Sequence, residues 1–361
     1  MKLKSFWNLI WSDKKYKTVF IICACAAFFI IVGAIVANYY SRRPGGLAQS
    51  TKKTATAVPQ PMVISLLDGM SYPKDLANRH PLAVSVENHP EARPQSGLNK
   101  ASIVYETMTE GGITRFLAVY GPNEATEIGP IRSARLYFMD WVKEYDAFFA
   151  HAGGNEDALA NIDNYQIKNL ENNTGYFYRD YKGKAVASEH TLYSSTSKLY
   201  DFAKSLKFDT SSSSFEALKF KTDGPAENPG KSAEINFSSE SYKVNWSFDP
   251  NKNIYLRNLA GSPHKDRVTG EQITAKNIVI QTVQRTFQPT GSYGSQNYVY
   301  QNVGSGPAYV LQDGKAIKGT WKKTNRDSRT KFYDESGVEI QFNPGPTWYE
   351  VIPPEVNPSF S

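Results

Sequence analysis

The stretch SARLYFMDWVKEYDAFFAHAGGNEDALANI, residues 133–162, carries the pattern that decides the fold class of the N-terminal half. Apolar side chains recur at helical spacing between Ala134 and Tyr145, which predicts an amphipathic helix. The run AFFAH at 147–151 is typical of a short buried strand, and AGGN at 152–155 predicts a tight turn followed by a helix N-cap. A helix that leads into a strand in this way indicates an α/β or α+β domain.

Strand signals precede this stretch, and a further helix follows it. Three runs rich in β-branched and aromatic residues predict strands, and the EGG between the last two is typical of a hairpin turn. The runs are PLAVSV (81–86), ASIVYE (101–106) and ITRFLAVY (113–120), with EGG at 110–112 and a closing helix at 195–206. We therefore expect residues 62–208 to form an α/β or α+β domain with a mixed sheet.

The composition changes between residues 209 and 235, where four consecutive serines and a cluster of Gly and Pro interrupt the pattern. This segment is predicted to be a linker. Residues 236–361 contain short alternating runs, from SYKVNWSF (241–248) to VEIQF (338–342), separated by turn signals. They predict a smaller, mostly β domain, either a sandwich or a barrel.

A run of 20 uncharged residues, TVFIICACAAFFIIVGAIVA (18–37), has about the length that a helix needs to cross the roughly 30 Å hydrocarbon core of a membrane. It is too long for the apolar region of a cleaved signal peptide, so we expect a transmembrane signal anchor. A lipid on Cys25 is the alternative, but the apolar run continues well past that residue. We assign residues 1–17 to the cytoplasm and 38–61 to a flexible stalk. The bulk of a single-pass cell-membrane protein then lies outside the cytoplasm.

The net charge of +6 comes from the N-terminal segment. Residues 1–60 hold nine of the 41 Lys and Arg and one of the 35 Asp and Glu, which leaves 32 basic and 34 acidic residues in 61–361. A nucleic-acid-binding domain keeps its positive charge on the folded part, so we expect no nucleic-acid partner. Both cysteines, Cys23 and Cys25, lie in the apolar run, so the outer part has no cysteine nucleophile.

Two arginines, Arg132 and Arg135, flank Ser133 shortly after a Gly-Pro pair. If Ser133 caps the helix, both guanidinium groups lie at its first turn, where the helix dipole already favours an anion. The two positive charges then need a negative partner, which is either an external anionic ligand or a set of internal carboxylates. The internal candidates are Glu106, Glu110, Glu124 and Glu127.

Further polar candidates lie around the predicted hairpin at 101–120 and at His151, the last residue of the predicted strand 147–151. Carboxylates beside Arg115 form either an acid/base pair or a salt-bridged loop, and ligands collect at the carboxyl ends of strands in α/β sheets. The candidates for catalysis are Glu106, Glu110, His151 and His190, and those for ligand binding are Arg115, His151, Gly153, Gly154 and Asn155. The five histidines show no close spacing typical of a metal site, so we expect no metal and no cofactor.

Four stretches of the N-terminal half stand out as motifs: VENHPEARPQSGLNKASIVYETMTEGGITRFLAVY (86–120), IGPIRSARLYF (128–138), FFAHAGGN (148–155) and SEHTLYSST (188–196). Together with residues 246–280 and 319–353, they resemble the YerB-like lipoproteins, a bacterial family of unknown function. The resemblance implies a two-domain extracytoplasmic protein tethered to the membrane, and it implies no reaction. The recurring polar positions are Glu87, Asn88, Arg93, Gln95, Glu110, Arg115, Arg132, Ser133, Arg135, His151 and His190. Six of them complete the set of ligand-binding candidates: Glu87, Asn88, Arg93, Arg132, Ser133 and Arg135. The apolar helix without a clear lipobox departs from the lipoprotein pattern.

Three functions are open from the sequence. The first is a binding module that recognises an anionic wall polymer or lipid headgroup through Arg115, Arg132, Arg135 and the turn at 153–155. The second is an envelope transferase or hydrolase for a phosphorylated or glycan substrate, with His151 or His190 as acid/base and Glu106 or Glu110 as its partner. The third is an adaptor that contacts an envelope protein through the β domain. We favour the binding module over an enzyme.

Overall fold

The β-branched runs of the N-terminal half form strands where the sequence predicts them. The computed structural model describes residues 14–41 and 60–361, except 213 and 291–294. The four predicted strands are β3 (Leu82–Glu87), β4 (Ile103–Met108), β5 (Thr114–Tyr120) and β6 (Phe148–His151). All of their residues are buried, as expected for strands that are covered on both faces.

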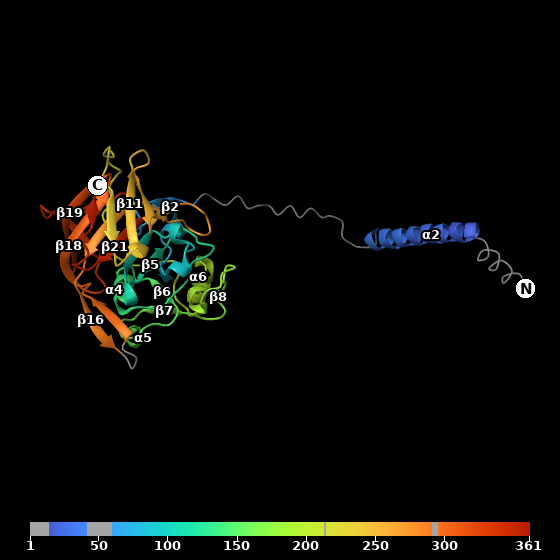
Figure 1. Ribbon diagram of the computed structural model, residues 1–361, viewed down its shortest axis with the longest axis horizontal. Helices are drawn as coiled ribbons and strands as arrows, with labels where there is room; N and C mark the ends of the chain where they lie inside the picture. Colours follow the sequence, from blue (N-terminus) through green and yellow to red (C-terminus); the bar gives the residue numbers. More distant parts are fainter. Residues whose placement is uncertain (1–13, 42–59, 213, 291–294) are drawn as a thin grey trace, which may run out of the picture. The chain divides into compact units, whose positions relative to one another are not determined.

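These strands belong to one ten-stranded mixed sheet that runs through both halves of the chain. The order is β20 (Lys331–Asp334), β19 (Lys315–Lys323), β18 (Gly304–Gln312), β15 (Asn277–Thr282), β21 (Thr347–Ile352), β4, β5, β3, β6 and β7 (Lys168–Glu171). Strand β21 pairs in parallel with both β15 and β4, so the C-terminal half extends the sheet of the N-terminal half directly. Figure 1 shows the orange and red strands of this extension.

Alternate residues of the ten-stranded sheet point into two different cores. Val84 packs into the core that includes a second sheet and α6 (Thr196–Ser205), whereas Ala83 packs into the core that includes α4 (Leu136–Glu144) and α5 (Glu156–Asn161). The ten-stranded sheet is therefore the middle layer of the fold. Helices α4, α5 and α6 confirm the three predicted helices.

The second sheet has six strands and comes entirely from the C-terminal half. They are β13 (Ser262–Pro263), β12 (Ile254–Leu259), β11 (Lys243–Asp249), β10 (Ala233–Asn236), β22 (Ser359–Phe360) and β14 (Thr274–Ala275), which pairs with β12. Trp246 of β11 meets Trp348 of β21 edge-on, with ring centroids 5.3 Å apart. The two sheets thus pack against each other across one core. The sequence left a sandwich or a barrel open for the C-terminal half alone, whereas one of these two sheets is shared with the N-terminal half. The run at 338–342 is not a strand and forms isolated bridges.

Short elements complete residues 60–361. They are β1 (Met62–Ile64) with β2 (Ser71–Pro73), α3 (Lys74–Ala77), β8 (Tyr178–Arg179) with β9 (Leu192–Tyr193), β16 (Arg285–Thr290) with β17 (Ser295–Tyr300), and five 3-10 turns, at Pro90–Ala92, Leu98–Lys100, Glu110–Gly112, Ser188–His190 and Glu240–Tyr242. The predicted EGG turn is one of the latter. Because the two halves share a sheet, the division into domains at 209–235 stays a prediction.

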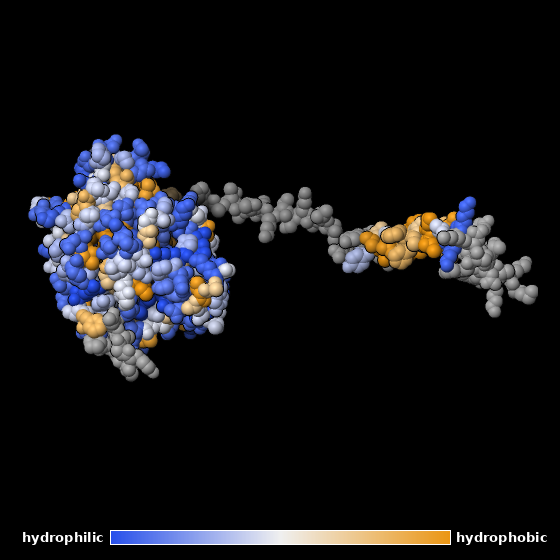
Figure 2. All heavy atoms as spheres, viewed as in Figure 1, coloured by the Kyte–Doolittle hydropathy of each residue, from blue (hydrophilic) through white to orange (hydrophobic). Residues whose placement is uncertain are grey.

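The helix expected at 18–37 is α2 (Lys14–Ser41). Its segment Lys17–Tyr39 has 23 residues, and an 18-residue window within it has a mean hydropathy of 3.1, so the helix is long and apolar enough to cross a membrane. Figure 2 shows this helix in orange, whereas the visible face of residues 60–361 is mainly hydrophilic. Most of the predicted segments 1–17 and 38–61 lie outside the described residues, so the topology assigned to them stays a prediction.

Candidate functional site

Polar side chains collect at one end of the central strands. Strand β3 ends at Glu87, whose register partner on the antiparallel neighbour β5 is Arg115. Glu106 lies on β4, one residue before the register partner of Arg115. All three side chains belong to buried residues, with exposed fractions of 1% for Glu87, 4% for Arg115 and 0% for Glu106. The strand order therefore explains why candidates that are distant in sequence meet.

The segment before α4 is extended rather than helical. The backbone N–H of Arg132 donates to the carbonyl of Ser85 on β3 at 2.9 Å, which ties this segment to the sheet. Helix α4 therefore starts at Leu136, with Arg135 at the N-cap. The expectation that Ser133 caps the helix is wrong, because a residue held against the sheet lies too early to be the cap.

Both arginines of the predicted pair are bound by internal carboxylates. Arg135 contacts Glu110 twice, Nε to Oε1 at 2.7 Å and Nη2 to Oε2 at 2.6 Å, and its Nη1 donates to a backbone carbonyl at 2.8 Å. Arg132 pairs through Nε with Glu87 and through Nη2 with Glu189 at 3.2 Å. The Glu189 side chain is 55% exposed, so water or another anion can replace it as the second partner of Arg132.

The other three carboxylates expected as partners serve different cations. Glu124 pairs with Arg79 at 3.1 Å, Glu127 pairs with Lys182 at 2.6 Å, and Glu106 pairs with Arg257 of β12. Both side chains of the Glu106–Arg257 pair are fully buried, and the Arg257 guanidinium lies 4.7 Å from the ring centroid of Trp348. Glu106 is therefore closed off from solvent and is poorly placed for acid/base chemistry on an external substrate.

Two further ionisable groups surround this buried pair. Glu350 on β21 lies with its Oε1 4.0 Å from Arg257 Nε, and burial together with the charge of Glu106 raises the pKa of Glu350 to about 8. His264 Nδ1 lies 2.6 Å from Arg257 Nη1, and burial together with the charge of Arg257 holds the pKa of His264 well below its usual value. A neutral imidazole accepts this hydrogen bond from the arginine. The network joins the two sheets.

The same network contains Asn88, Arg93 and Gln95, three of the polar positions that the resemblance to the YerB-like family implies. Arg93 Nε donates to Asn88 Oδ1 at 3.1 Å, and Gln95 Nε2 donates to the same oxygen at 2.9 Å. Asn88 Nδ2 donates to Glu106 at 3.1 Å, and Gln95 Oε1 lies 2.8 Å from His264 Nε2. These contacts explain the three polar residues as a structural support of the buried pair.

Arg115 is less completely bound. Its Nη1 donates to the Ser133 carbonyl at 3.2 Å, and its Nε finds no acceptor among the described residues. Burial and the neighbouring charge of Arg135 lower the pKa of Arg115 to about 10. The side chain helps to hold Ser133 against the sheet.

His151 is occupied on both ring nitrogens. Nδ1 lies 2.8 Å from the Gly153 carbonyl and Nε2 lies 2.8 Å from Asn169 Oδ1, in a fully buried residue whose pKa burial lowers. Asn155 is the predicted N-cap of α5, where it accepts from the backbone N–H of Ala158 at 3.3 Å. Gly153 has φ +61°, and a Cβ on it would meet no atom within 4 Å. The residues of the turn at 152–155 are therefore explained by the positive φ of Gly153 and by the N-cap of α5, without a ligand.

His190 lies beside two of the predicted ligand-binding residues. Its Nδ1 is 3.2 Å from Glu87 Oε2, the oxygen that also pairs with Arg132. Its Nε2 is 3.4 Å from Glu91 Oε2, and its ring stacks on His89 with centroids 4.8 Å apart. The carboxylate partner of His190 is thus Glu87 or Glu91, and neither of the two partners expected from the sequence.

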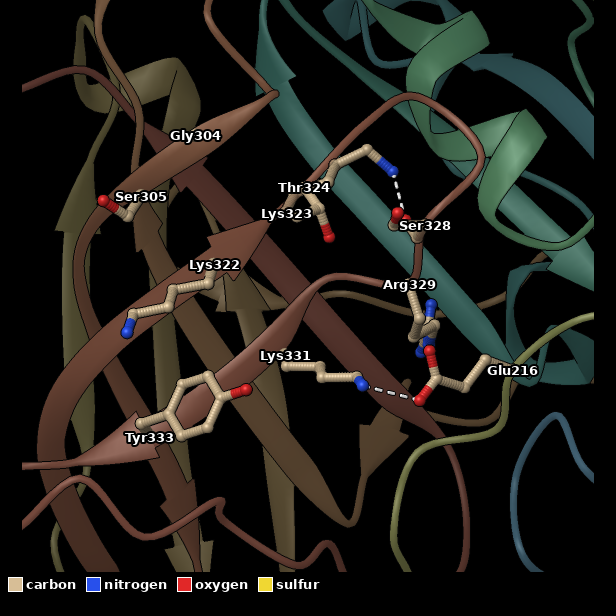
Figure 3. A pocket seen from close by; sticks show the side chains of 10 residues that line it. All are labelled: Glu216, Gly304, Ser305, Lys322, Lys323, Thr324, Ser328, Arg329, Lys331 and Tyr333. Atoms are coloured by element: carbon tan, nitrogen blue, oxygen red, sulfur yellow. Dashed lines mark hydrogen bonds and ion pairs between the residues drawn. The ribbon is translucent and has the colours of Figure 1, made fainter.

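A pocket with four cations among its ten lining residues, here called the cationic pocket, is formed mainly by the C-terminal half (Figure 3). It has a volume of about 510 Å³ and is lined by Glu216, Gly304, Ser305, Lys322, Lys323, Thr324, Ser328, Arg329, Lys331 and Tyr333. Sequence reasoning missed this pocket. The signal was present in WKKTNRDSRTK (321–331), which carries five basic residues and one acidic residue.

Comparison with known proteins assigns both halves of the chain to one family. Residues 67–209 match the family described as "Protein of unknown function (DUF3048) N-terminal domain", and residues 233–349 match its C-terminal domain. The chain belongs to the DUF3048 family.

Two matches to the YerB protein of Bacillus subtilis, one by sequence and one by structure, extend this result. The protein of strain 168 named "Putative lipoprotein YerB" is 29% identical over 349 residues, which cover 94% of this chain and 96% of the relative. The crystal structure of the YerB protein matches with a TM-score of 0.73 and 27% identity, covering 83% of this chain and 99% of that one. The YerB-like resemblance and the mixed α+β fold are confirmed. The names of these relatives specify neither a ligand nor a reaction.

Proposed function

We propose that the protein is tethered to the outer face of the cell membrane and binds an anionic polymer of the envelope in the cationic pocket of Figure 3. The apolar helix α2 supports tethering by a single span. The name of the YerB relative supports a place in the envelope and leaves a lipid on Cys25 as the alternative anchor. The binding role is non-catalytic.

The charge balance of the pocket carries the proposal. Four of its lining residues are cations: Lys322, Lys323, Arg329 and Lys331. Glu216 binds Lys331 at 2.6 Å, and the buried Glu144 binds both Lys323 at 2.9 Å and Arg329 at 3.0 Å. The side chains of Lys323 and Arg329 are buried, with 0% and 2% exposed, so the cations that the pocket presents are Lys322 and Lys331. Glu216 balances Lys331, which leaves one positive charge, that of Lys322, for a ligand.

Lys322 is the cation best placed to meet that ligand. It is exposed, its ammonium lies 5.2 Å from the ring centroid of Tyr333, and the described part of the chain offers it no carboxylate within ion-pair distance. Hydroxyl groups of Ser305, Thr324, Ser328 and Tyr333 line the same pocket. Cations beside hydroxyls suit a phosphate-bearing polyol or sugar, which offers charged oxygens and hydroxyls together.

The site predicted around Arg115, Arg132 and Arg135 stays a second candidate for the anion. Its support is weaker, because Glu110 and a carbonyl occupy every nitrogen of Arg135. Arg132 keeps one exchangeable partner, Glu189. These contacts favour a structural role for the pair.

The test is a titration of the full-length protein in detergent micelles with a synthetic glycerol-phosphate oligomer and, separately, with inorganic phosphate. The variants are Lys322→Glu and, as a matched control, Lys252→Glu, an exposed lysine in the turn between β11 and β12 that does not line the pocket. A charge-assisted hydrogen bond contributes roughly 1.5–3 kcal/mol, or about 10- to 150-fold in affinity. We expect Lys322→Glu to weaken oligomer binding by at least this factor and the control to leave it unchanged. No binding by wild type at low salt, or equal loss in both variants, contradicts the proposal.

The alternative of an envelope hydrolase or transferase is favoured by one observation, the contact of His190 with Glu87 beside Arg132. A carboxylate-bound histidine is a common general acid/base. Hydrolysis of a chromogenic phosphodiester by wild type that is lost in His190→Ala and kept in Glu189→Gln supports this alternative. Equal rates in wild type and His190→Ala remove it.

A further inference from the structure

His89, Glu91 and His190 bring three potential metal ligands together on the surface of the N-terminal half. His89 and Glu91 follow β3 and are separated by one residue, and His190 ends the turn Ser188–His190. One donor atom from each residue lies within 4.8 Å of the others, and His190 Nε2 is 3.4 Å from Glu91 Oε2. We propose that these three side chains bind a divalent transition-metal ion, with Zn²⁺ as the best match to two imidazoles and a carboxylate.

Glu87 supplies the support that a metal-binding histidine needs. Its Oε2 lies 3.2 Å from His190 Nδ1, and the residue is 1% exposed. A hydrogen bond from Nδ1–H to this carboxylate leaves the lone pair of Nε2 free on the side of Glu91. Arg132 also pairs with Glu87 and holds its carboxylate in place. Metal-bound histidines usually have such a carboxylate behind them.

The charge around the cluster favours a cation over an anion. Glu87, Glu91 and Glu189 contribute three carboxylates, and Arg132 contributes one positive charge. Arg115 also faces Glu87 and adds a second positive charge, so with neutral imidazoles the group carries a net charge of −1, which still favours a cation. The site is thus distinct in chemistry and in place from the cationic pocket, which is lined by residues of the C-terminal half and Glu216.

Ion binding requires a small rearrangement. The rings of His89 and His190 stack with an interplanar angle of 11°, whereas an ion lies in the plane of each imidazole that binds it. His89 is half-buried, and its Nδ1 accepts a long hydrogen bond of 3.3 Å from the Glu91 backbone. The Glu91 side chain is 53% exposed. Both residues can therefore turn toward His190, whose orientation Glu87 sets.

The test is direct metal binding by the full-length protein in detergent micelles, with Cys23→Ser and Cys25→Ser in every sample so that no thiol contributes. Zn²⁺ is titrated calorimetrically, and Co²⁺ is titrated by its visible absorption, which reports ligand geometry. We expect one ion per chain and loss of the site in His190→Ala and His89→Ala. Glu87→Gln weakens binding by about 10- to 100-fold, the usual effect of removing a carboxylate behind a ligating histidine.

Two further variants keep the outcome decisive. Glu189→Gln removes a neighbouring carboxylate that is outside the ligand set, and we expect it to bind Zn²⁺ as wild type does within about threefold, because an exposed charge is well screened. Glu91→Gln changes an exposed side chain, so it tests the carboxylate ligand even if a histidine variant fails to fold. Absence of a Co²⁺ spectrum in wild type, or Zn²⁺ binding that Glu91→Gln and His190→Ala leave unchanged, overturns the proposal.

Discussion

Replacing Arg257 by Met is expected to weaken the contact between the two sheets and to lower the free energy of unfolding by several kcal/mol. Arg257 lies on β12 of the six-stranded sheet and Glu106 on β4 of the ten-stranded sheet, and neither side chain has any exposed surface. Methionine keeps much of the apolar contact with Trp348 and removes the charge. The variant leaves the Glu106 carboxylate buried with Asn88 and Thr114 as its polar partners.

The magnitude follows from the burial. Removing one member of a fully buried ion pair typically costs about 3–5 kcal/mol, because the remaining charge is desolvated without compensation. The double variant Arg257→Met/Glu106→Gln removes both charges, so we expect it to recover most of that loss. The matched control is Arg79→Met, which breaks a pair with Glu124, whose side chain is 63% exposed. Exposed pairs contribute about 0–1 kcal/mol.

The assay is urea unfolding of the full-length protein in detergent micelles, followed by tryptophan fluorescence. Urea is uncharged and does not screen the ion pair, and Trp246 and Trp348 both lie against Arg257. A free energy of unfolding for Arg257→Met within about 1 kcal/mol of wild type would refute the reasoning. So would a double variant that is less stable than Arg257→Met, since the argument requires the orphaned charge to be the source of the cost.

Two further predictions concern Glu350 and Asn155. Burial and the charge of Glu106 raise the pKa of Glu350 to about 8 in the folded state, well above that of an exposed carboxyl group. The proton of Glu350 therefore stabilises the fold at low pH, and this contribution is lost as the pH rises from about 5 to 8. Glu350→Gln is expected to flatten this part of the stability profile in urea unfolding measured at several pH values, and an unchanged slope contradicts the pKa assignment. Asn155→Ala removes the N-cap of α5 and should lower the free energy of unfolding by about 1 kcal/mol. Asn155→Asp keeps an acceptor for the Ala158 N–H and should be as stable as wild type. Thermal unfolding measures both variants, and equal melting temperatures for the two argue against capping.

Local signals in the sequence were sufficient for four strands and three helices of the N-terminal half, and they missed β7 and the short elements. The runs that became β3, β4 and β5 are rich in β-branched and aromatic residues, and α4 has its apolar residues at helical spacing, so each pattern reports a conformation set within a few residues. The Ser133 cap failed for the converse reason. Whether a residue caps a helix depends on what its neighbours bond to, and Arg132 bonds to Ser85, 47 positions earlier in the chain.

Local sequence patterns did not predict which charged residues form ion pairs with one another. The sequence offered four carboxylates for Arg132 and Arg135, and one of them, Glu110, is a partner. Glu106 meets Arg257, which is 151 positions away, because β12 of the second sheet packs over β4. Likewise, His190 meets Glu87 through the approach of the turn Ser188–His190 to the end of β3. Ion pairs form between groups that packing brings together, and separation along the chain does not limit them.

By itself, the amino-acid sequence determined the apolar helix at the N-terminus and the concentration of positive charge in the first 60 residues. It also determined four strands and three helices of the first half, and the membership of the YerB-like family. These properties depend on composition, on short periodic patterns and on long runs of matched residues. Tertiary structure alone decided that β21 joins β4 in one sheet, that Arg135 is neutralised internally, and that the basic run at 321–331 lines a pocket. Each of these depends on which distant surfaces bury one another, because the apolar faces of the two sheets and the helices must be covered together.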